Sequence, residues 1–508
     1  MYAASNKGRD GVLATVPVTS DSPGARIVAH LTVFRYNPQF PATFPPPRHG
    51  MIRILNPLLL GLAVALPQSA LAQDPFPADS AIQAMIDQRV ESGWSTGIVL
   101  GIIRPDGRKR FFVHGQGSDG QVLNERSIME IGSITKVFTG ILLAEMTARG
   151  EVKLQEPVQA LLPTGTHVPE RNGQSITLLD LTTHTSGLPR LPANLHPKDP
   201  ADPYADYSDS LLYDFLASYI LSRDIGSRYM YSNLGAGLLG HALATRARVP
   251  YELLLRQRVL DPLRLRETVI TMKPELQQRL VIGHNADGEV VPPWTFTTLA
   301  PAGALHSTAR DLLSFLEANL DPRPRSPLHD VLRSAREPHR SAGDSTMMVG
   351  LGWHIWKGNG QELVWHNGQT AGFHSFIGLD TTRHVAVVIL SSSMSDIDDL
   401  GFHLLDQLRP LVASRSIAPV SVPDSLLQQY VGEYQLAPAF SIVVEKAGSR
   451  LTAQATGQPK ISIYPSSLNE FFLRAVEARV SFERDSSGAL DHLILYQNGR
   501  ELQGKKIK

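Results

Sequence analysis

The chain has 508 residues, of which 42% are hydrophobic and 19% charged. This is the balance of a soluble globular protein that is too long for one compact core. The 48 basic residues equal the 48 acidic residues, so no excess charge favours nucleic acid or an anionic membrane surface as a partner. The absence of cysteine excludes disulfides, thiol catalysis and thiolate metal sites.

Residues 51–72 have the pattern of a secretory signal peptide. Arg53 precedes an apolar run over 54–66, and Ala70-Leu71-Ala72 supplies a small-x-small cleavage site. The run is shorter than the roughly 20 residues that span a bilayer, so no transmembrane anchor is expected after cleavage. Because a signal peptide begins a chain, residues 1–50 are interpreted as a disordered or misassigned extension. The sequence therefore predicts a periplasmic or secreted protein.

The main domain is predicted over 73–411, with strand patterns near both of its ends. Early in the domain, two apolar segments flank the turn Pro105-Asp106-Gly107 and predict a β-hairpin. Residues 150–345 are mainly helical patterns joined by long loops. Strand patterns return in three segments: ELVWHNG (362–368), GFHSFIGLD (372–380) and HVAVVILSS (384–392). Pairing early with late strands in one antiparallel sheet flanked by helices, with a helical subdomain inserted, is the simplest way to bury both.

The last part of the chain reads as a separate unit. Residues 412–423, VASRSIAPVSVP, are typical of a linker. Segments within 424–508 alternate apolar and polar residues and are broken by Gly and Asn-Gly turns. We expect a small all-β domain there, a barrel or curled sheet. The expected fold class is therefore α/β (α+β) with an added β domain.

The stretch MEIGSITKVFTG (129–140) places Ser133 three residues before Lys136, at the start of a helical pattern over 133–149. Residues three apart share a helix face, so the two side chains can meet. Burial makes a lysine lose its charge readily, and a neutral amine can take the proton of a serine nucleophile. The alternative is a helix-capping serine beside an exposed lysine.

Two further groups are candidates for the same site. In RYMYSNLG, Tyr231 can relay protons and ionise more easily beside a cationic lysine, and Asn233 can bind a substrate amide. In VWHNGQT, His366 lies on or beside a strand, Gly368 permits close backbone approach, and the N–H of Gln369 can complete an oxyanion site. The alternatives are a buried tyrosine with a capping serine, and a polar turn at a strand edge.

In this order, the motifs Ser-x-x-Lys, Tyr-x-Asn and His-x-Gly resemble those of class C β-lactamases and of related D-Ala-D-Ala peptidases and esterases. Three segments resemble framework segments of these serine hydrolases: LTTHTSGLP (181–189), GALHSTARDLLSF (303–315) and GLGWHI (350–355). The resemblance covers about residues 78–410. The C-terminal module resembles the lipocalin-like domain that some members carry. The family fold implies an antiparallel sheet flanked by helices, with a helical subdomain.

The resemblance also implies roles for the motif residues. Ser133 would be the acylated nucleophile, and Lys136 and Tyr231 would handle its proton. Asn233 would contact the substrate amide. The backbone N–H groups of Ser133 and Gln369 would bind the oxyanion.

One position departs from the β-lactamase pattern, which has Lys-Thr-Gly where this chain has His366-Asn367-Gly368. Because an unperturbed histidine is mostly neutral at pH 7, the fixed positive charge for a β-lactam carboxylate is weakened. The sequence predicts an exported serine acyl-hydrolase acting on β-lactams or D-alanyl peptides, without metal or organic cofactor. The alternatives are an esterase of the same family and a non-hydrolytic penicillin or muropeptide sensor.

Other signals favour structural roles. Ser95 matches G-x-S-x-G, but a helix precedes it and a strand follows, the reverse of a nucleophile elbow. No histidine belongs to H-E-x-x-H or to an acidic cluster in the sequence, and no phosphate loop follows a strand. His184 is expected to be a structural hydrogen-bonding residue and His374 a satisfied strand histidine. Trp353 and Trp365 are expected in the core or cleft wall.

Overall fold

The protein is described from a computed structural model. The described residues are 74–508 without 118–121, 321–327, 344–345, 359, 413–418, 438–439, 449, 457–459, 475–477 and 498–499. The predicted signal peptide and the extension before it lie outside the described residues. Among the described residues, no helix has both the length and the apolar character needed to cross a bilayer.

The main domain is built on an eight-stranded antiparallel sheet with strand order β2-β1-β14-β13-β12-β11-β10-β9. Its strands are β1 (Gly97–Ile103), β2 (Lys109–Gly115), β9 (Arg340–Ser341), β10 (Met347–Val349), β11 (His354–Gly358), β12 (Gln361–Gln369), β13 (His374–Asp380) and β14 (Val385–Ser391). The predicted hairpin forms β1 and β2, and β1 pairs directly with β14. The predicted pairing of early with late strands is confirmed.

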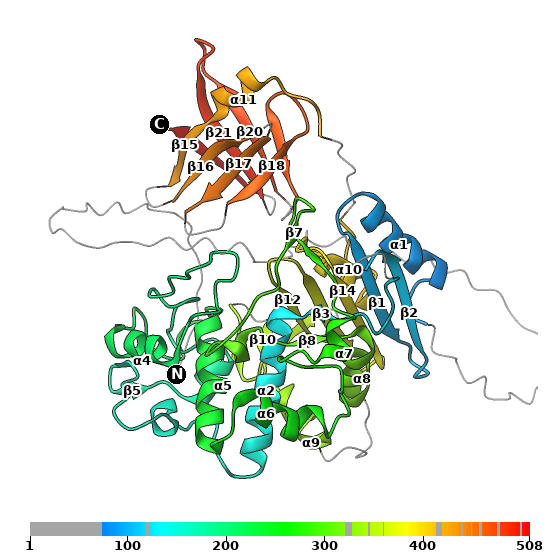
Figure 1. The fold of residues 1–508 in the computed structure, drawn as a ribbon, viewed down its shortest axis with the longest axis vertical. Helices are drawn as coiled ribbons and strands as arrows, with labels where there is room; N and C mark the ends of the chain where they lie inside the picture. The colour runs from blue at the N-terminus through cyan, green and yellow to red at the C-terminus, as the bar shows by residue number, and fades with distance from the viewer. Residues whose placement is uncertain are drawn as a thin grey trace, which may run out of the picture.

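Strand β1 is apolar throughout because helices cover both faces of the sheet. Ile98 and Leu100 belong to the core under α1 (Asp79–Glu91) and α10 (Asp398–Leu405), while Val99 points into the larger core with α8 (Ala309–Leu320). Figure 1 shows α1 and α10 on one side of the sheet, and α2 and α8 on the other. Because both faces are buried, a run of β-branched and leucine residues replaces the usual alternation of strands with one solvated face.

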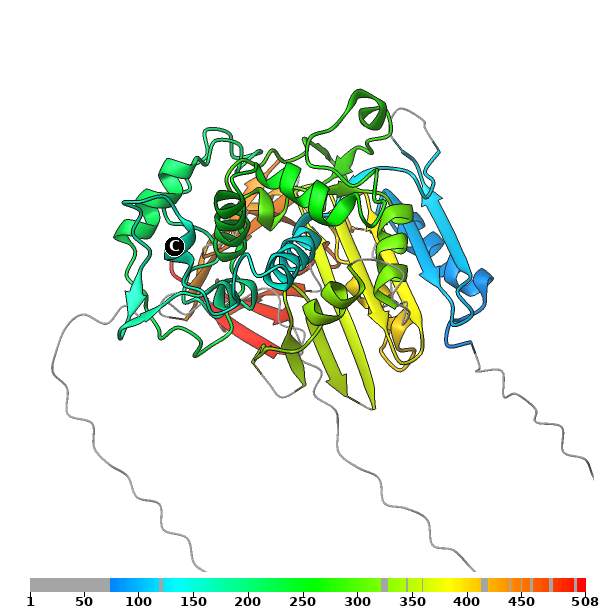
Figure 2. The ribbon, with the colours of Figure 1, turned by 90° about the horizontal axis from the view of Figure 1, so that it is seen from below.

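Residues between the strand groups form the predicted helical part. The helices not yet given are η2 (Gly132–Ile134), α2 (Thr135–Ala148), η3 (Val158–Leu161), α3 (Leu178–Thr182), α4 (Asp209–Ser218), α5 (Asn233–Ala247), α6 (Tyr251–Leu255), η4 (Arg256–Leu260), α7 (Pro274–Gln277), η5 (Ala300–Ala302) and α9 (His329–Ala335). Short pairs join β3 (Met129–Glu130) to β8 (His306–Ser307), β4 (Glu170–Arg171) to β5 (Gln174–Ser175), and β6 (Gly283–His284) to β7 (Val290–Val291). Seen from below, α2 lies between these helices and the sheet (Figure 2).

Two glycines let α2 approach the β10–β11 connection closely. A Cβ on Gly140 would lie 2.1 Å from the carbonyl oxygen of Leu351, and one on Gly352 would lie 2.3 Å from that of Lys136. Gly352 also has φ +78°, a conformation that favours glycine. This contact holds the first turn of α2 against the sheet and so sets the position of Lys136.

The C-terminal unit is a closed eight-stranded barrel, as the alternating pattern predicted. Its strands are β15 (Gly432–Ala437), β16 (Phe440–Ala447), β17 (Arg450–Ala455), β18 (Ile461–Pro465), β19 (Glu470–Leu473), β20 (Ala478–Arg484), β21 (Leu490–Gln497) and β22 (Arg500–Lys506). Residues 424–508 are not entirely β, because α11 (Asp424–Tyr430) precedes the barrel. Tyr430 stacks on Phe482, ring centroids 4.3 Å apart, so the helix belongs to the barrel core.

The two units meet at the turn between β6 and β7, which reaches the barrel in Figure 1. Asp287 accepts hydrogen bonds from the hydroxyls of Ser462 and Tyr464. Glu289 accepts a 2.9 Å hydrogen bond from Arg450. At the hairpin base, the N–H of His284 lies 3.1 Å from the carbonyl oxygen of Gly372. The barrel is therefore linked to the end of the β12–β13 hairpin.

Candidate active site

Ser133 and Lys136 meet at the start of α2. Ser133 lies in the η2 turn, two residues before the first residue of α2, and its Oγ is 2.9 Å from Lys136 Nζ. The amine also donates a 2.6 Å hydrogen bond to the carbonyl oxygen of Ala302 in η5. Only 3% of Lys136 is exposed, so the alternative of an exposed helix lysine is wrong.

Burial lowers the pKa of Lys136 well below that of a free lysine, and the nearby Arg190 guanidinium lowers it further. The amine has no carboxylate partner among the described residues, and its two hydrogen-bond partners are uncharged. A neutral amine within hydrogen-bond distance of a hydroxyl can accept its proton. The sequence spacing and the tertiary burial together place a serine hydroxyl beside a neutral amine that can accept its proton.

Tyr231 lies over this pair. Lys136 Nζ is 4.9 Å from its ring centroid, and its hydroxyl is hydrogen-bonded to Ser133. Burial raises the pKa of Tyr231 to about 12, which differs from the expectation of easier ionisation. That expectation needed a cationic lysine, and a desolvated, neutral Lys136 supplies no such charge. Tyr231 is therefore a phenol that can pass a proton between its neighbours.

Asn233 begins α5, which Ser232 caps by accepting a 2.8 Å hydrogen bond from the N–H of Gly235. The capping role weighed for Ser232 is confirmed. The Oδ1 atom of Asn233 is buried without a hydrogen-bond partner. It borders a recess of about 20 Å³ that Ser133 and Gln369 also line. The recess has room for one water molecule or one carbonyl oxygen.

The third motif lies on β12, directly beside the nucleophile turn. A Cβ on Gly368 would lie 2.0 Å from the carbonyl oxygen of Ile131, so only glycine fits there. Gly132 has φ +49°, and a Cβ on it would lie 2.8 Å from the nitrogen of Gln369. These two glycines bring the backbone of Gln369 against that of the Ser133 turn, where the sequence predicted the oxyanion site.

His366 is 1% exposed, and its ring lies near those of Tyr231 and His354. Its Nδ1–H donates a 2.5 Å hydrogen bond to the carbonyl oxygen of Asn367, and its ring centroid is 5.0 Å from that of His354. Burial, His354 and Lys136 lower the pKa of His366 well below its usual value. His366 is neutral, as the sequence indicated, but its side chain is buried and not at the surface.

Two further residues contact Tyr231: His184, which the sequence predicted to have a structural role, and Arg190, which sequence reasoning missed. The ring of His184 packs at a tilt against that of Tyr231, with centroids 4.5 Å apart, and its Nδ1 accepts a 3.2 Å hydrogen bond from the N–H of Ser232, which confirms its structural role. Arg190 lies over the Tyr231 ring, 5.2 Å from the centroid. His184 and Arg190 lie in or next to the framework segment 181–189, which was the available signal.

Glu130, also missed, joins two walls of the recess. It accepts a 2.8 Å hydrogen bond from the N–H of Trp294 and a 2.7 Å bond from the hydroxyl of Thr370. Burial is the main cause that raises the pKa of Glu130 to about 7, and the charge of Asp202 adds to it. His306, opposite Glu130 in the β3–β8 pair, has a pKa lowered to about 4 and is neutral. Glu130 therefore ionises near neutral pH next to Gln369.

A second polar cluster lies beside β12. His374 Nε2 donates a 2.9 Å hydrogen bond to Asp398, which also accepts one from the amide of Asn367, and Asp396 is 3.8 Å away. The sequence showed no acidic cluster around a histidine, but the fold builds one from residues 24 apart. The ligand atoms of His374, Asp396 and Asp398 lie within 4.8 Å of one another, as a metal site would require. The hydrogen-bonded ion pair between His374 and Asp398 already explains why these side chains lie together.

Ser95 is not part of the site. It follows α1 and precedes β1, as expected, and it is buried with hydrogen bonds to Gly97 and Ser391. Trp353 is fully buried and stacks on Phe315, which confirms its place in the core. Trp365 stacks on His354, with ring centroids 4.8 Å apart.

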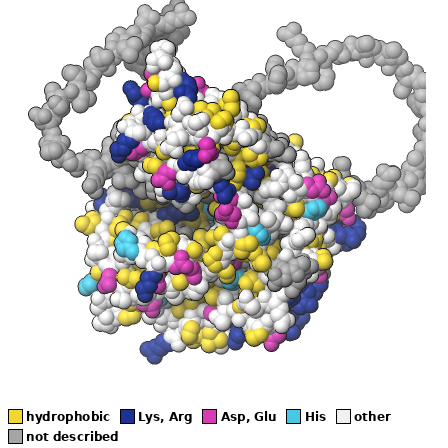
Figure 3. Space-filling model, turned by 45° about the horizontal axis from the view of Figure 1, so that its top comes forward, with side chains coloured by type: hydrophobic (Ala, Val, Ile, Leu, Met, Phe, Trp, Pro, Cys, Tyr) yellow, Lys and Arg dark blue, Asp and Glu magenta, His cyan; other side chains and the backbone are white. Residues whose placement is uncertain are grey.

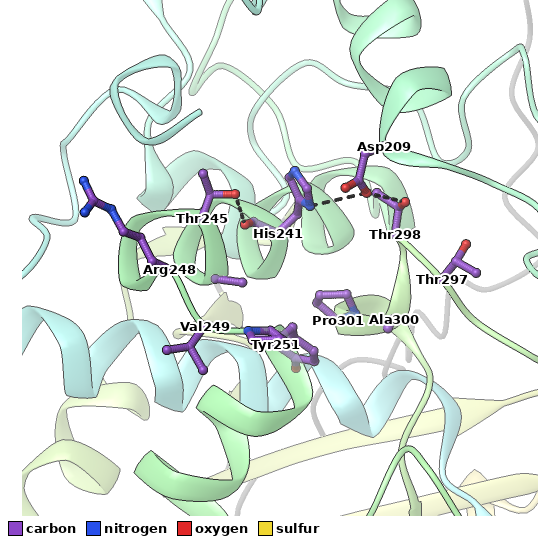
Figure 4. A pocket seen from close by; sticks show the side chains of 12 residues that line it. Asp209, His241, Thr245, Arg248, Val249, Tyr251, Thr297, Thr298, Ala300 and Pro301 are labelled. Carbon is purple, nitrogen blue, oxygen red and sulfur yellow. Dashed lines mark hydrogen bonds and ion pairs between the residues drawn. The ribbon is translucent and has the colours of Figure 1, made fainter. Parts of the chain in front are cut away.

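A surface pocket of about 500 Å³ lies away from Ser133 (Figure 4). Asp209, His241 and Thr298 lie together on one side of it, and Tyr251 with Pro301 lies below them. The pocket is on the other side of η5 from Lys136, because Pro301 lines it while the next residue holds the amine. It contains no nucleophile–base pair.

The face under the barrel carries charges of both signs, with hydrophobic side chains gathered near its centre (Figure 3). Basic residues form no continuous surface on this face, in agreement with the balanced composition.

Fold and site together are those of a serine hydrolase scaffold in which Lys136 and Tyr231 flank Ser133. A model of the β-lactamase family matches residues 82–407, so the chain belongs to that family. A model described as a domain of unknown function, DUF3471, matches residues 418–506, which include the barrel.

Named relatives point to a serine hydrolase of the β-lactamase or DD-peptidase type. The D-alanyl-D-alanine-carboxypeptidase/endopeptidase AmpH of Escherichia coli is 25% identical over 69% of this chain and 93% of its own length. A β-lactamase of Escherichia coli is 27% identical over 56% of this chain and 71% of its own length. Penicillin-binding protein 4* of Bacillus subtilis is 23% identical over 78% of this chain and 91% of its own length.

A solved structure has the same fold. The β-lactamase/D-alanine carboxypeptidase from Pseudomonas syringae superposes with a TM-score of 0.56 at 22% identity. The match covers 65% of this chain and 99% of that one. The hydrolase fold is thus shared in full, while the barrel is additional.

Proposed function

We propose that the protein is an exported serine acyl-hydrolase that forms an acyl-enzyme on Ser133, with β-lactams or D-alanyl peptides as substrates. The observation that carries the proposal is the buried, neutral amine of Lys136, 2.9 Å from Ser133 Oγ. A hydroxyl becomes a strong nucleophile only when a base removes its proton. The names of the relatives support the substrate class.

The reaction follows from the contacts. As Ser133 Oγ attacks the substrate carbonyl, its proton moves to Lys136 Nζ. The N–H groups of Ser133 and Gln369 stabilise the oxyanion. When the tetrahedral intermediate collapses, the phenol of Tyr231 passes a proton from Lys136 to the leaving nitrogen. Water then attacks the ester in the reverse sense and releases the acid, restoring the hydroxyl.

The burial of His366 bears on the choice between substrates. A neutral His366 provides no fixed charge for the carboxylate of a β-lactam. This supports peptide hydrolysis more than efficient β-lactam hydrolysis. Asn233 Oδ1, buried and unpartnered, suits the amide N–H of the acyl side of either substrate.

The test is labelling with a fluorescent penicillin, followed over time and mapped by mass spectrometry. We expect an adduct on Ser133 that disappears as the acyl-enzyme hydrolyses, and no adduct in Ser133→Ala. Ser95→Ala is the control, and it should label and turn over like the unaltered protein. An adduct on another residue would overturn the proposal, and a label that never leaves would indicate a sensor.

Turnover of nitrocefin, a D-Ala-D-Ala peptide and a short-chain p-nitrophenyl ester separates the activities. Hydrolysis of the ester alone would establish the esterase alternative.

Export is tested by expressing residues 51–508 and sequencing the amino terminus of the periplasmic protein. We expect it to begin after Ala72, whereas an intact cytoplasmic product would contradict the prediction.

A further inference from the structure

Arg190 is an exposed cation beside a buried catalytic centre. Its backbone is fixed by the second motif, because its carbonyl oxygen accepts hydrogen bonds from the N–H groups of Asn233, at 2.9 Å, and Leu234, at 3.2 Å. Its guanidinium carbon lies 5.2 Å from the ring centroid of Tyr231. The side chain therefore stands on the α5 wall of the site, next to the residue that faces the acyl part of a substrate.

The charge of Arg190 is not compensated. Among the described residues, no carboxylate lies within ion-pair distance of it, although most other arginines near the main domain's surface have such a partner. Tyr231 is a phenol, and Lys136 is a neutral amine. An unpaired guanidinium at the border of a water-excluding site binds carboxylates well, because the planar fork donates two parallel hydrogen bonds.

The acidic cluster near the third motif lies on the other face of the sheet. Asn367 donates a hydrogen bond to Asp398 at the start of α10, the helix on the sheet face away from α2. His374 pairs with the same carboxylate there. This cluster therefore does not compensate the charge of Arg190.

We propose that Arg190 is a specificity-determining residue that selects acyl donors carrying a carboxylate on the acyl side, such as an acidic peptide stem or a dicarboxylic acyl group. The inference rests on the proposed function, since it concerns the substrate of the same acyl-enzyme. Asn233 holds the acyl part of the substrate, and Arg190, one hydrogen bond further along the same wall, pairs with its carboxylate. Arg190 thus supplies a positive charge that the neutral His366 does not. This charge acts on the acyl side of the scissile bond.

The experiment compares two esters that differ only in charge, p-nitrophenyl hemiglutarate and p-nitrophenyl valerate, with the full chain. Each transfers its acyl group to Ser133 and releases p-nitrophenolate, and water then releases the acid. We expect the ratio of kcat/KM, anionic to neutral, to fall on the order of tenfold in Arg190→Gln. Arg190→Lys should retain most of the ratio, and Arg190→Glu should lower it further.

Arg333→Gln is the matched control, because Arg333 is an exposed arginine on α9. In Figure 1, α9 lies at the end of the main domain that is away from the barrel. The ratio in Arg333→Gln should equal that of the unaltered protein. A second measurement needs no variant: raising the salt concentration from about 0.05 to 0.5 M should lower the ratio in the unaltered protein, because salt screens exposed charges.

An equal loss on both esters in Arg190→Gln, with a shifted pH profile, would overturn the inference and show that Arg190 only tunes Lys136. A ratio that neither salt nor Arg190→Glu changes would also overturn it. If the unaltered protein hydrolyses neither ester nor nitrocefin nor a D-Ala-D-Ala peptide, the proposed function itself fails. The two failures are therefore distinguishable.

Discussion

Two histidines on neighbouring strands, His366 on β12 and His374 on β13, have the same exposure but different protonation states. Each is 1% exposed. Burial, His354 and Lys136 lower the pKa of His366 well below its usual value. The pKa of His374 is raised to about 9 despite its burial, because Asp398 and Asp396 lie against it. One ring is neutral and the other a cation.

The difference shows that the neighbours of a buried group, and not its burial alone, decide its charge. Burial opposes ionisation at both positions, and two carboxylates reverse the outcome only at His374. The proposed catalytic side, which contains Lys136 and Tyr231, has no carboxylate in direct contact with these groups among the residues that the structure describes. It therefore keeps a lysine, a tyrosine and three histidines uncharged, as proton transfer at neutral pH requires.

Removing Lys136, the proposed base, should have the largest effect. Lys136→Met should lower kcat/KM by at least about a thousandfold, because the serine loses its proton acceptor. The folded protein should become more stable, since the desolvated amine is gone. The pKa of Lys136 is depressed on folding, so the unfolded chain binds the extra proton, and the gain should be largest at low pH.

Initial rates with nitrocefin and urea unfolding from pH 5 to 9 check this prediction. Lys153→Met, at an exposed lysine, is the control and should match the unaltered protein in both. A destabilised Lys136→Met variant would show that the amine contributes to folding through its hydrogen bonds.

Removing the carboxylate that pairs with His374 should lower the stability of the folded protein. Asp398→Asn should lower the free energy of unfolding by about 3 kcal/mol, because it leaves His374 without its closest counter-charge. The pKa of His374 is raised on folding, so its contribution is fully present below about pH 6.5 and is lost as pH rises through about 9. Urea unfolding at pH 6 and pH 9 should therefore differ less in the variant. Asp330→Asn, at an exposed carboxylate, is the control, and an unchanged pH dependence in Asp398→Asn would contradict the charge pair.

Glu130 sharpens the comparison, because it is a buried carboxylate without a cation. Its pKa is raised to about 7 on folding, so the folded protein holds the extra proton between about pH 4.5 and 7. Stability should fall by about 3 kcal/mol as pH rises through this window. Glu130→Gln cannot ionise and should lose this fall while keeping the hydrogen bond from Thr370. Unfolding at pH 5 and pH 8 tests it, with Glu317→Gln as the exposed control; an identical slope in Glu130→Gln would disprove the assignment.

The smallest effect is expected when a lysine replaces His366. In His366→Lys, burial and the nearby Lys136 should keep the new amine neutral at pH 7. The kcat/KM for a carboxylate-bearing β-lactam should then change less than about tenfold. A larger rise would show that the site can hold a charge there. Turnover of the neutral ester p-nitrophenyl valerate is the control for changes outside carboxylate recognition.

Much of the framework could be predicted from local patterns. The run GIVLGII and the segment HVAVVILSS are apolar enough to require burial on both faces, and their pairing across nearly 290 residues followed from that need. The three motifs could be placed because each combines reactive residues with glycine or a helix start. The barrel was visible in its alternation, but α11 at its start was not, because seven residues carry too short a period.

Contacts between distant loops could not be predicted. Glu130, Trp294 and Thr370 meet only after β3, η5 and β12 have packed. Arg190 occupies a loop without a regular period, so its contact with Tyr231 had no local signal. The ionisation of Tyr231 was misjudged for the same reason, because it depends on the charge of Lys136 in the folded protein.

The sequence by itself determined which residues can do chemistry and which segments must be buried, because spacing along a helix or strand is a local property. Only the tertiary structure decided which of these groups carry charge. Charge depends on the water and the partners that packing removes or supplies, and those come from segments far apart in the chain. Thus His366 and His374 are the same residue type on neighbouring strands, but they differ in protonation in the folded protein.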